Sequence, residues 1–186
     1  MKTACILAIG DELLNGFTLD TNSHWIKEKL FKYNIIVQNS MVVPDEETSI
    51  INSLKFIINQ KYDILFITGG IGPTHDDITK NTLSKFLGKN IHINQAHMNY
   101  LKKNIFNKHF KKNKNENRKI DQMIESQCAT IDSFVHLDNK IGTALGMSGT
   151  HNGTKIYVLP GVPVEMKKIF NDSILPNYEK NNTNKI

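Results

Sequence analysis

The sequence predicts an α/β protein in which a mostly parallel sheet carries helices on both faces, with an antiparallel hairpin near the C-terminus. Two short segments, Ala4–Ile9 and Ile64–Thr68, are apolar throughout and are each followed by glycine, a pattern typical of strands buried on both faces. Segments with apolar residues at helical spacing alternate with the strands. Repeated strand–helix alternation of this kind favours a parallel sheet.

The length and composition fit one domain. The chain has 186 residues, of which 39% are hydrophobic and 22% charged, enough to bury one core. We expect residues 1–175 to form this domain and residues 176–186, rich in Asn and Lys, to be a flexible tail. Cys5 and Cys128 lie far apart without metal-ligand spacing, which fits a reducing cytoplasm.

The first half of the chain is predicted to alternate strand and helix. Beyond the first strand and an acidic loop, Ile26, Leu30 and Tyr33 mark a helix behind possible caps at residues 21–23. Ile35–Val43 follows as a strand rich in β-branched residues. After Pro44, Asp45 is expected to cap a helix that starts with two acids and whose apolar stripe consists of Ile50, Ile51, Leu54, Ile57 and Ile58.

The middle of the chain departs from this alternation. A helix over residues 78–87 is expected to end at Gly88, since glycine often terminates helices. Apolar residues then predict an exposed helix around Leu101 and a further helix around Met123, separated by a Lys- and Asn-rich loop, Lys108–Lys119. We expect this region to be an insertion over one end of the sheet.

The C-terminal part predicts a hairpin and a last helix. Ala144–Ser148 and Lys155–Leu159 read as two strands on either side of the turn-rich residues 149–153. A helix is expected to follow Pro163.

Charge and hydropathy disfavour two classes of partner. The net charge is +5, and much of the excess lies between Lys102 and Lys119. Because no aromatic interleaving or helix-turn-helix pattern accompanies these residues, a solvated surface is favoured over contact with nucleic acid. No segment approaches the length of a membrane span, and the apolar N-terminus lacks a cleavage pattern, so a membrane partner is not expected.

Four loops with unusual compositions follow predicted strands. They are Gly10–Gly16, Gly69–Asp77, Ile141–Gly146 and Pro160–Pro163. Ligands of parallel α/β sheets bind at the carboxyl ends of the strands, so these loops are the candidate site.

The Gly69–Asp77 loop carries the strongest signal. Gly69, Gly70 and Gly72 let the backbone approach a ligand, and the helix that follows offers N–H groups to an anion such as phosphate. No Gly-Lys-Ser/Thr follows, and His75 stands where the last glycine of GxGxxG belongs. A kinase or a Rossmann dehydrogenase is therefore disfavoured.

Acidic residues accompany two of these loops. Asp76 and Asp77 would repel a phosphate unless a divalent cation lay between, and Mg²⁺ prefers carboxylate and phosphate oxygens. Asp11 and Glu12 repeat the pattern at the first strand, so two acidic loops are expected to converge on one pocket. The alternative is that Asp76 and Asp77 only favour the positive end of a helix dipole.

Seven motifs together resemble a known family. They are Gly10-Asp-Glu-Leu-Leu-Asn-Gly16, Asp20-Thr-Asn22, Val43-Pro-Asp-Glu46, Gly69-Gly-Ile-Gly-Pro-Thr-His-Asp-Asp77, Asn117-Arg118, Gly142-Thr-Ala-Leu-Gly146 and Leu159-Pro-Gly-Val-Pro163. The set resembles the molybdopterin-binding-like domain, and within it the N-terminal domain of competence/damage-inducible protein A and the matching domain of eukaryotic FAD synthases. The motifs run in family order over nearly the whole chain.

The resemblance implies a three-layer α/β/α sandwich of the molybdopterin-binding-like fold. Similar domains of the family hydrolyse the pyrophosphate bond of ADP-ribose with a divalent metal or have been linked to FAD hydrolysis. The implied activity is thus a metal-dependent hydrolase of a nucleotide pyrophosphate bond that uses Mg²⁺, Mn²⁺ or Co²⁺. We expect a cytoplasmic homo-oligomer that takes a small nucleotide or pterin ligand.

The resemblance also assigns roles to residues. The predicted catalytic residues are Asp77, Asp76 and Asp11, and the predicted metal ligands are Asp11, Glu12 and Asp77. The predicted substrate and phosphate contacts are Gly69, Gly70, Gly72, Thr74, Asn22, Gly142, Thr143, Gly146, Pro160 and Gly161.

Two other functions stay open at this point. One is a molybdopterin-binding protein or an adenylyltransferase of molybdenum cofactor biosynthesis, and the other is a non-catalytic ligand-binding module. Competence proteins usually carry Thr in place of Asp11 and Pro in place of Leu145, so their substrate preference is not transferred. Because the sequence ends before any second domain, amidohydrolase and FAD-forming activities are not expected.

Overall fold

The computed structural model describes residues 1–106 and 114–182. In chain order the helices and strands are β1 (Lys2–Ile9), α1 (Asp11–Leu14), α2 (Thr21–Phe31), β2 (Ile35–Val43), α3 (Glu47–Asn59), β3 (Ile64–Thr68), α4 (Thr79–Leu87), β4 (Ile91–Ile93), α5 (Gln95–Leu101), the π-helical turn η1 (Lys102–Phe106), α6 (Lys114–Cys128), β5 (Ala129–Ile131), β6 (Val135–Leu137), β7 (Gly146–His151), β8 (Thr154–Leu159), α7 (Pro163–Ile169), the π-helical turn η2 (Phe170–Ile174) and α8 (Pro176–Asn182).

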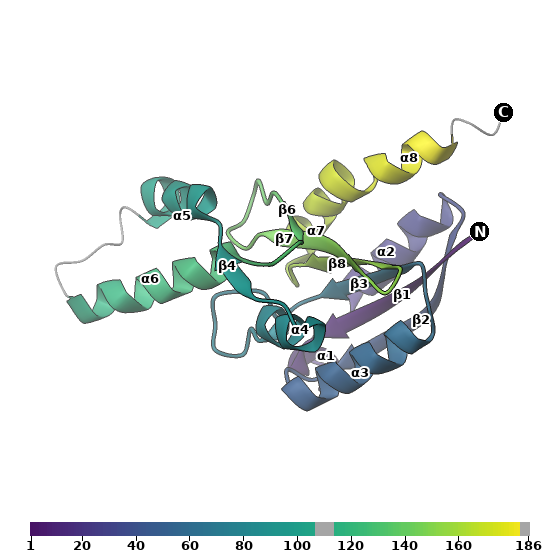
Figure 1. Ribbon diagram of the computed structural model, residues 1–186, viewed down its shortest axis with the longest axis horizontal. Helices are drawn as coiled ribbons and strands as arrows, with labels where there is room; N and C mark the ends of the chain where they lie inside the picture. Colours follow the sequence, from purple (N-terminus) through teal and green to yellow (C-terminus); the bar gives the residue numbers. More distant parts are fainter. Residues whose placement is uncertain (107–113, 183–186) are drawn as a thin grey trace.

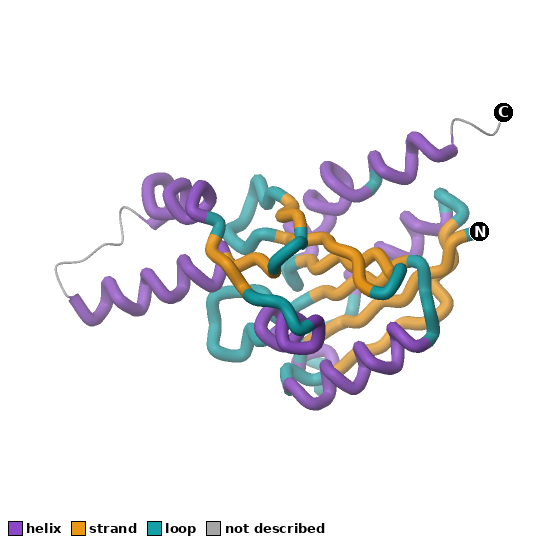
Figure 2. Tube along the Cα trace, viewed as in Figure 1, coloured by secondary structure: helices purple, strands orange, loops and turns teal. Residues whose placement is uncertain are grey.

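The main sheet has six strands in the order β2-β1-β3-β8-β7-β6 (Figures 1 and 2). β2, β1, β3 and β8 are parallel neighbours, whereas β7 runs antiparallel to both β8 and β6. β4 and β5 form a separate antiparallel pair. The predicted α/β fold, with a mostly parallel sheet and an antiparallel C-terminal hairpin, is confirmed.

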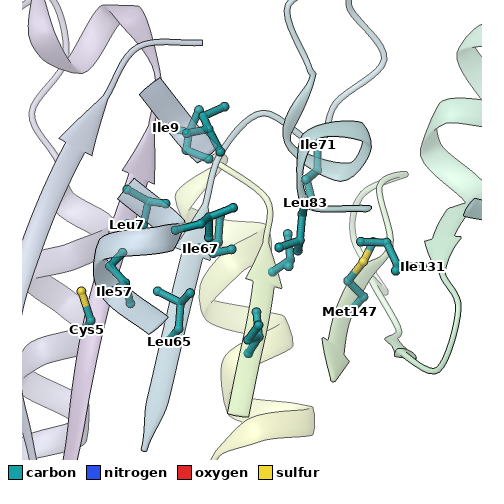
Figure 3. Packing of buried hydrophobic residues seen from close by; sticks show 14 of the residues in the cluster. Cys5, Leu7, Ile9, Ile57, Leu65, Ile67, Ile71, Leu83, Ile131 and Met147 are labelled. Carbon is teal, nitrogen blue, oxygen red and sulfur yellow. The ribbon is translucent and has the colours of Figure 1, made fainter. Parts of the chain in front are cut away.

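Two hydrophobic cores lie on opposite faces of the sheet. Alternate residues of β1 and β3 point to opposite faces: Leu7 and Leu65 pack under α3 and α4, and Ile6 and Phe66 pack under α2, α7 and η2. Figure 3 shows the first of these clusters around Leu7, Leu65 and Ile67. Because helices cover both faces, the central strands β1 and β3 are buried over consecutive residues, Ala4–Ile9 and Ile64–Thr68, as the sequence predicted.

The residue that caps α2 lies one position before the predicted caps. The side chain of Asp20 accepts a hydrogen bond from the N–H of Ser23 at 2.9 Å, so Asp20 is the capping residue. The end of α4 agrees with the prediction, since Gly88 adopts a left-handed conformation with φ 63°.

The C-terminal hairpin has a shorter turn than the sequence suggested. Asn152 and Gly153 have φ values of 48° and 85°, as the favoured two-residue hairpin turn requires. Gly149 therefore lies within β7 and not in the loop. A Cβ atom on Gly149 would overlap the ring of Phe134, so this glycine makes room for packing.

The insertion after residue 94 projects beyond the sheet on the side away from the two termini (Figure 1). α5 and α6 pack around their own small core of Leu101, Ile124 and Cys128, each fully buried. Leu101 itself is thus buried, while Tyr100 beside it is 51% exposed, so α5 is exposed on one face and packed on the other. Part of the predicted loop, residues 114–119, belongs to α6, while residues 107–113 lie outside the described part of the chain.

The segment predicted as a flexible tail from residue 176 forms α8 as far as Asn182. The Tyr178 ring is 8% exposed and joins the core beneath α2 and α7. Its hydroxyl lies 3.1 Å from that of Tyr157. The polar composition of the segment did not predict this contact, because only one aromatic residue makes it. Residues 183–186 lie outside the described part of the chain.

No helix in residues 1–106 and 114–182 is both long enough and apolar enough to cross a membrane.

Tyr178 provides a test of the α8 packing. We expect Tyr178→Ala to lower the free energy of unfolding by about 3 kcal/mol, as is usual for removing a buried aromatic ring. Tyr178→Phe should cost only about 1 kcal/mol, because it leaves the Tyr157 hydroxyl unpaired. Urea denaturation measures both, with Lys55→Ala, at an exposed position of α3, as the control. Equal stability of the wild type and Tyr178→Ala would show that α8 contributes little to the fold.

Candidate functional site

A cleft of about 610 Å³ opens at the carboxyl ends of the parallel strands. Its wall is formed by the loops after β1, β2, β3 and β8, together with the end of α6 and the Thr143–Ala144 segment. The chain leaves β1 towards β2 on one side and β3 towards β8 on the other. The cleft therefore lies at the topological switch point of the sheet, where ligands of such folds bind.

Glycines allow the loops to meet at the base of the cleft. Gly69 has φ 94°, and a Cβ atom there would overlap the carbonyl oxygen of Ile9. A Cβ on Gly70, which has φ 63°, would overlap the Thr79 hydroxyl. A Cβ on Gly161 would lie 3.4 Å from the Cα of Gly69. The ends of β1, β3 and β8 thus touch backbone to backbone.

The Asp77 side chain closes the glycine-rich loop on itself. One carboxylate oxygen accepts a hydrogen bond from the N–H of Gly72 at 2.7 Å. The other accepts from the N–H and the hydroxyl of Thr74 at 2.8 and 2.6 Å. The carboxylate thus occupies the position on these donors that an external anion could take. The N–H of Gly69 is also paired, with the carbonyl of Leu159 at 3.1 Å.

Asp45 joins the acidic group that the sequence placed at Asp11 and Asp77. The N–H of Asp11 donates to the Asp45 carboxylate at 3.1 Å, and the N–H of Asp45 donates to the Asp11 carboxylate at 3.3 Å. This reciprocal pair ties the loop after β1 to the loop after β2. Among the described residues, the second oxygen of each carboxylate has no hydrogen-bond partner.

The acidic group is electrostatically costly. Burial raises the pKa of Asp45, and the negative charges of Asp11, Glu12 and Asp77 raise it further, while the hydrogen bond from the Asp11 N–H acts in the opposite direction. Asp76 and Glu165 line the cleft as well, and no cationic side chain is among the lining residues. Positive charge brought into the cleft would relieve this repulsion.

A buried lysine lies behind the cleft wall. Lys80 is 5% exposed, and its ammonium group donates to the carbonyls of Ser126 and Gln127, at 2.8 and 3.4 Å, at the end of α6. Burial lowers the pKa of Lys80 to about 8, while the charges of Cys128 and Asp77 act to raise it. Lys80 thus fastens the insertion to α4.

The Ile141–Gly146 loop is held by Asn139 and Glu165. The Asn139 amide donates to the Glu165 carboxylate at 2.6 Å and to the Ala144 carbonyl at 3.1 Å. Its oxygen accepts from the N–H of Gly142 at 2.9 Å. A Cβ on Gly142 would overlap the Glu165 carboxylate, which lines the cleft.

The cleft brings together most of the residues that the sequence analysis assigned to the site. Those that line it are Asp11, Glu12, Gly69, Gly70, Gly72, Thr74, Asp76, Asp77, Thr143, Pro160 and Gly161. Gly142 contacts Glu165 instead, and Gly146 pairs with Leu137 inside the sheet. Asn22 donates to the Gly161 carbonyl at 2.7 Å and lines a smaller neighbouring pocket.

Sequence reasoning did not assign Asp45, Glu165, Gln127 or Phe17, which also line the cleft. Asp45 was interpreted as a helix cap, although its place directly after β2 could have pointed to the carboxyl edge. Glu165 could have been inferred from its position in the first turn of α7 after the loop that follows β8. No sequence pattern pointed to Gln127, because only the packing of α6 brings it to the cleft.

Across residues 1–106 and 114–182, no three His, Cys, Asp or Glu side chains are gathered closely enough to hold a metal ion. The donor types at the cleft are nevertheless hard carboxylate oxygens, which suit Mg²⁺ and Mn²⁺. The unpaired oxygens of Asp11 and Asp45 are the available donors, whereas both oxygens of Asp77 are engaged by the loop.

The fold and the cleft define the class of protein: an α/β domain whose cleft lies at the topological switch point of its sheet, where ligands of such folds bind. A family model described as "Probable molybdopterin binding domain" matches residues 5–180. The chain therefore belongs to the molybdopterin-binding domain family.

Relatives within the family include a CinA-like protein of Thermosipho melanesiensis, 36% identical over 97% of this chain. The chain spans 43% of the length of that protein. A protein of Pyrococcus furiosus is 32% identical over 92% of this chain and 68% of its own length.

Solved structures agree with this assignment. The structure of CinA from Thermoplasma acidophilum, a protein of unknown function, matches with a TM-score of 0.79 and 25% identity, covering 95% of this chain and 98% of that one. The molybdopterin biosynthesis enzyme MoaB from Thermus thermophilus matches with a TM-score of 0.61 and 20% identity, covering 95% and 91% of the two chains, and shares the fold.

The loop-closing role of Asp77 can be measured directly. In Asn, an NH₂ group replaces one of the two carboxylate oxygens. Because NH₂ cannot accept from the loop's donors, Asp77→Asn must lose at least one of the three hydrogen bonds. We expect Asp77→Asn to speed amide hydrogen exchange at Gly72 and Thr74 by at least about tenfold, since hydrogen bonds to charged groups contribute roughly 1.5–3 kcal/mol. Asp76→Asn is the matched control. Unchanged exchange in Asp77→Asn would refute the role.

Lys80 predicts an unusual pH dependence of stability. Its pKa is lower in the folded than in the unfolded protein, so above about pH 8 the unfolded state binds more protons and stability rises with pH. Compared with Lys80→Met, the wild type should gain on the order of 2 kcal/mol between about pH 7 and about pH 9.5. Urea denaturation at several pH values measures this difference. A difference independent of pH would contradict the buried, pKa-shifted lysine.

Proposed function

We propose that the protein is a metal-dependent hydrolase that cleaves the pyrophosphate bond of a nucleotide such as ADP-ribose or FAD. One observation carries the proposal: the carboxylates of Asp11, Glu12, Asp45 and Asp77 line the same cleft as a glycine-rich loop whose Gly72 and Thr74 N–H groups bind a carboxylate, that of Asp77. Carboxylates beside a phosphate-binding loop would repel the phosphate unless a cation lay between them.

The hydrogen bonds of Asp11, Asp45 and Asp77 tie the loops together, but they do not offset the repulsion between the negative charges. Asp45 is driven towards its protonated form by burial and by three neighbouring charges. A fold under selection for stability alone would place fewer acids here, because like charges at short range destabilise the native state. A divalent cation would convert the repulsion into ligation, and Asp11 and Asp45 each have an oxygen to offer.

Asp77 can serve the loop or a cation, but not both fully. While it accepts hydrogen bonds from Gly72 and Thr74, these donors are unavailable to phosphate. If the Asp77 carboxylate turns towards a bound cation, the two N–H groups and the Thr74 hydroxyl become free for phosphate oxygens. The same side chain would thus protect the loop in the free protein and release it when ligand and metal bind together.

The remaining residues fit a hydrolytic step. In pyrophosphate hydrolysis, water attacks one phosphorus, the bond from that phosphorus to the bridging oxygen breaks, and the bridging oxygen leaves with the other phosphate. A divalent metal supplies charge neutralisation for the phosphate oxygens. Asp76 is exposed at the cleft, and its carboxylate can accept the proton of the attacking water.

The family description favours a second candidate, a protein that binds molybdopterin without cleaving it. The same cleft and loop would hold the phosphate of a pterin. This candidate does not require a metal, so the acidic group supports it less well.

A substrate panel separates the two functions. We expect purified protein to release AMP from ADP-ribose or FAD with Mg²⁺, Mn²⁺ or Co²⁺ and to stop when a chelator is added. Asp45→Asn should reduce turnover by at least about a hundredfold. In metal-free buffer the same variant should unfold at a higher temperature than the wild type, because one half-buried charge that its neighbours repel is gone.

The control is Asp132→Asn, an exposed acid paired with His92 outside the cleft, which should keep wild-type turnover. Binding of a pterin phosphate without AMP release from any nucleotide would favour the second candidate. Turnover unaffected by both the chelator and Asp45→Asn would exclude the metal role.

A further inference from the structure

The amide of Gln127 is an unusual polar group at the wall of the cleft. The side chain is 1% exposed and lines the cleft at the end of α6. Its oxygen accepts a hydrogen bond from the Thr143 hydroxyl at 2.7 Å. Its nitrogen is buried and has no hydrogen-bond partner among the described residues. A buried donor without a partner is rare in folded proteins and costs roughly 1–3 kcal/mol.

The surroundings hold this amide in place. The backbone carbonyl of Gln127 accepts hydrogen bonds from the N–H of Leu145 at 3.2 Å and from the ammonium group of Lys80 at 3.4 Å. The Thr143 carbonyl lies 2.8 Å from the ring nitrogen Nε2 of His97. The backbones on both sides of the Gln127–Thr143 pair are therefore anchored, and they hold the amide nitrogen at a position where no described residue pairs with it.

The pair has the hydrogen-bonding pattern of a hydroxyl-binding site. Thr143 uses its only proton on Gln127, which leaves its oxygen as an acceptor beside the free amide donor of Gln127. A ligand hydroxyl both accepts and donates, and so satisfies both groups at once. A carbonyl or phosphate oxygen would satisfy only the amide, and an ammonium group only the hydroxyl.

The position of the pair identifies which part of a nucleotide would reach it. Phosphates are assigned to the glycine-rich loop and the acidic group formed by the loops after β1, β2 and β3. Gln127 and Thr143 come from α6 and the loop before β7, and both are uncharged. Two uncharged hydrogen-bonding side chains suit the sugar next to the phosphates, and the charges nearest to them are Glu165, beside Gly142, and Lys80, on the Gln127 backbone carbonyl.

We propose that Gln127 and Thr143 form a sugar subsite in which the Gln127 amide donates to, and the Thr143 oxygen accepts from, a ribose hydroxyl of the bound nucleotide. This inference rests on the proposed function for the identity of the ligand, and on the unpaired donor for the existence of the subsite.

Binding of AMP, the nucleotide product of the proposed reaction, tests the subsite by titration calorimetry against 2′-deoxy-AMP and 3′-deoxy-AMP. Wild type should bind AMP about tenfold more tightly than at least one deoxy analogue, the loss expected when a buried polar group is left unpaired. Gln127→Met, of similar size, should bind all three equally. Gln122→Met, at an exposed position of the same helix, should behave as wild type.

Thermal unfolding of the free protein gives a readout that needs no ligand. A binding residue that carries an unpaired donor destabilises the free protein, so Gln127→Met should melt at the same or a higher temperature than wild type. A purely structural Gln127 would instead give a melting temperature lower by more than about 4 °C, as its bond to Thr143 is lost.

The outcomes separate the two proposals. Where AMP binds, equal discrimination by wild type and Gln127→Met, or none in either, overturns the sugar subsite. Where wild type binds no nucleotide, the proposed function fails and the melting temperature decides. An unchanged or higher value for Gln127→Met supports a subsite for a hydroxyl of another ligand, and a value lower by more than about 4 °C overturns it.

Discussion

The close approach of three strand ends is the constraint on which the rest of the site depends. Gly69 lies so near the Ile9 carbonyl that no side chain fits, and Gly161 approaches Gly69 from β8. Only this backbone contact brings the loops after β1, β3 and β8 around one cleft. The positive φ values of Gly69 and Gly70 then turn the chain back, so that the loop can fold over Asp77. Any larger residue at Gly69 would push apart the strands that form the cleft.

The cleft combines several groups that the fold alone would not favour. Asp45 is half-buried among other carboxylates. Within residues 1–106 and 114–182, the ammonium group of Lys80 pairs with backbone carbonyls only, and the amide nitrogen of Gln127 has no partner. Each lowers the stability of the free protein, and the two well-packed cores on either side of the sheet compensate for them. Clustering of such groups at one cleft is typical of a site whose side chains serve a ligand.

Family membership establishes the fold of this chain but not the chemistry of its cleft. The family match and the agreement with the Thermoplasma acidophilum structure establish the domain and its fold. The chain spans less than half of the Thermosipho melanesiensis relative, so an activity of that whole protein does not transfer by similarity. The proposed pyrophosphate chemistry therefore rests on this chain's own residues, Asp11, Asp45 and Asp77 above all.

The sequence by itself determined the parallel sheet, since buried strands must be apolar on both faces and Ala4–Ile9 and Ile64–Thr68 satisfy that condition locally. It also determined the glycine-rich loop, because the order of Gly69, Gly70 and Asp77 is a local pattern. Tertiary structure alone decided that Asp45 meets Asp11, that Gln127 reaches the cleft and that Tyr178 is buried. Each of these contacts joins residues far apart in the chain, and their geometry follows from how helices pack on the finished sheet. Local periodicity carries no record of such packing.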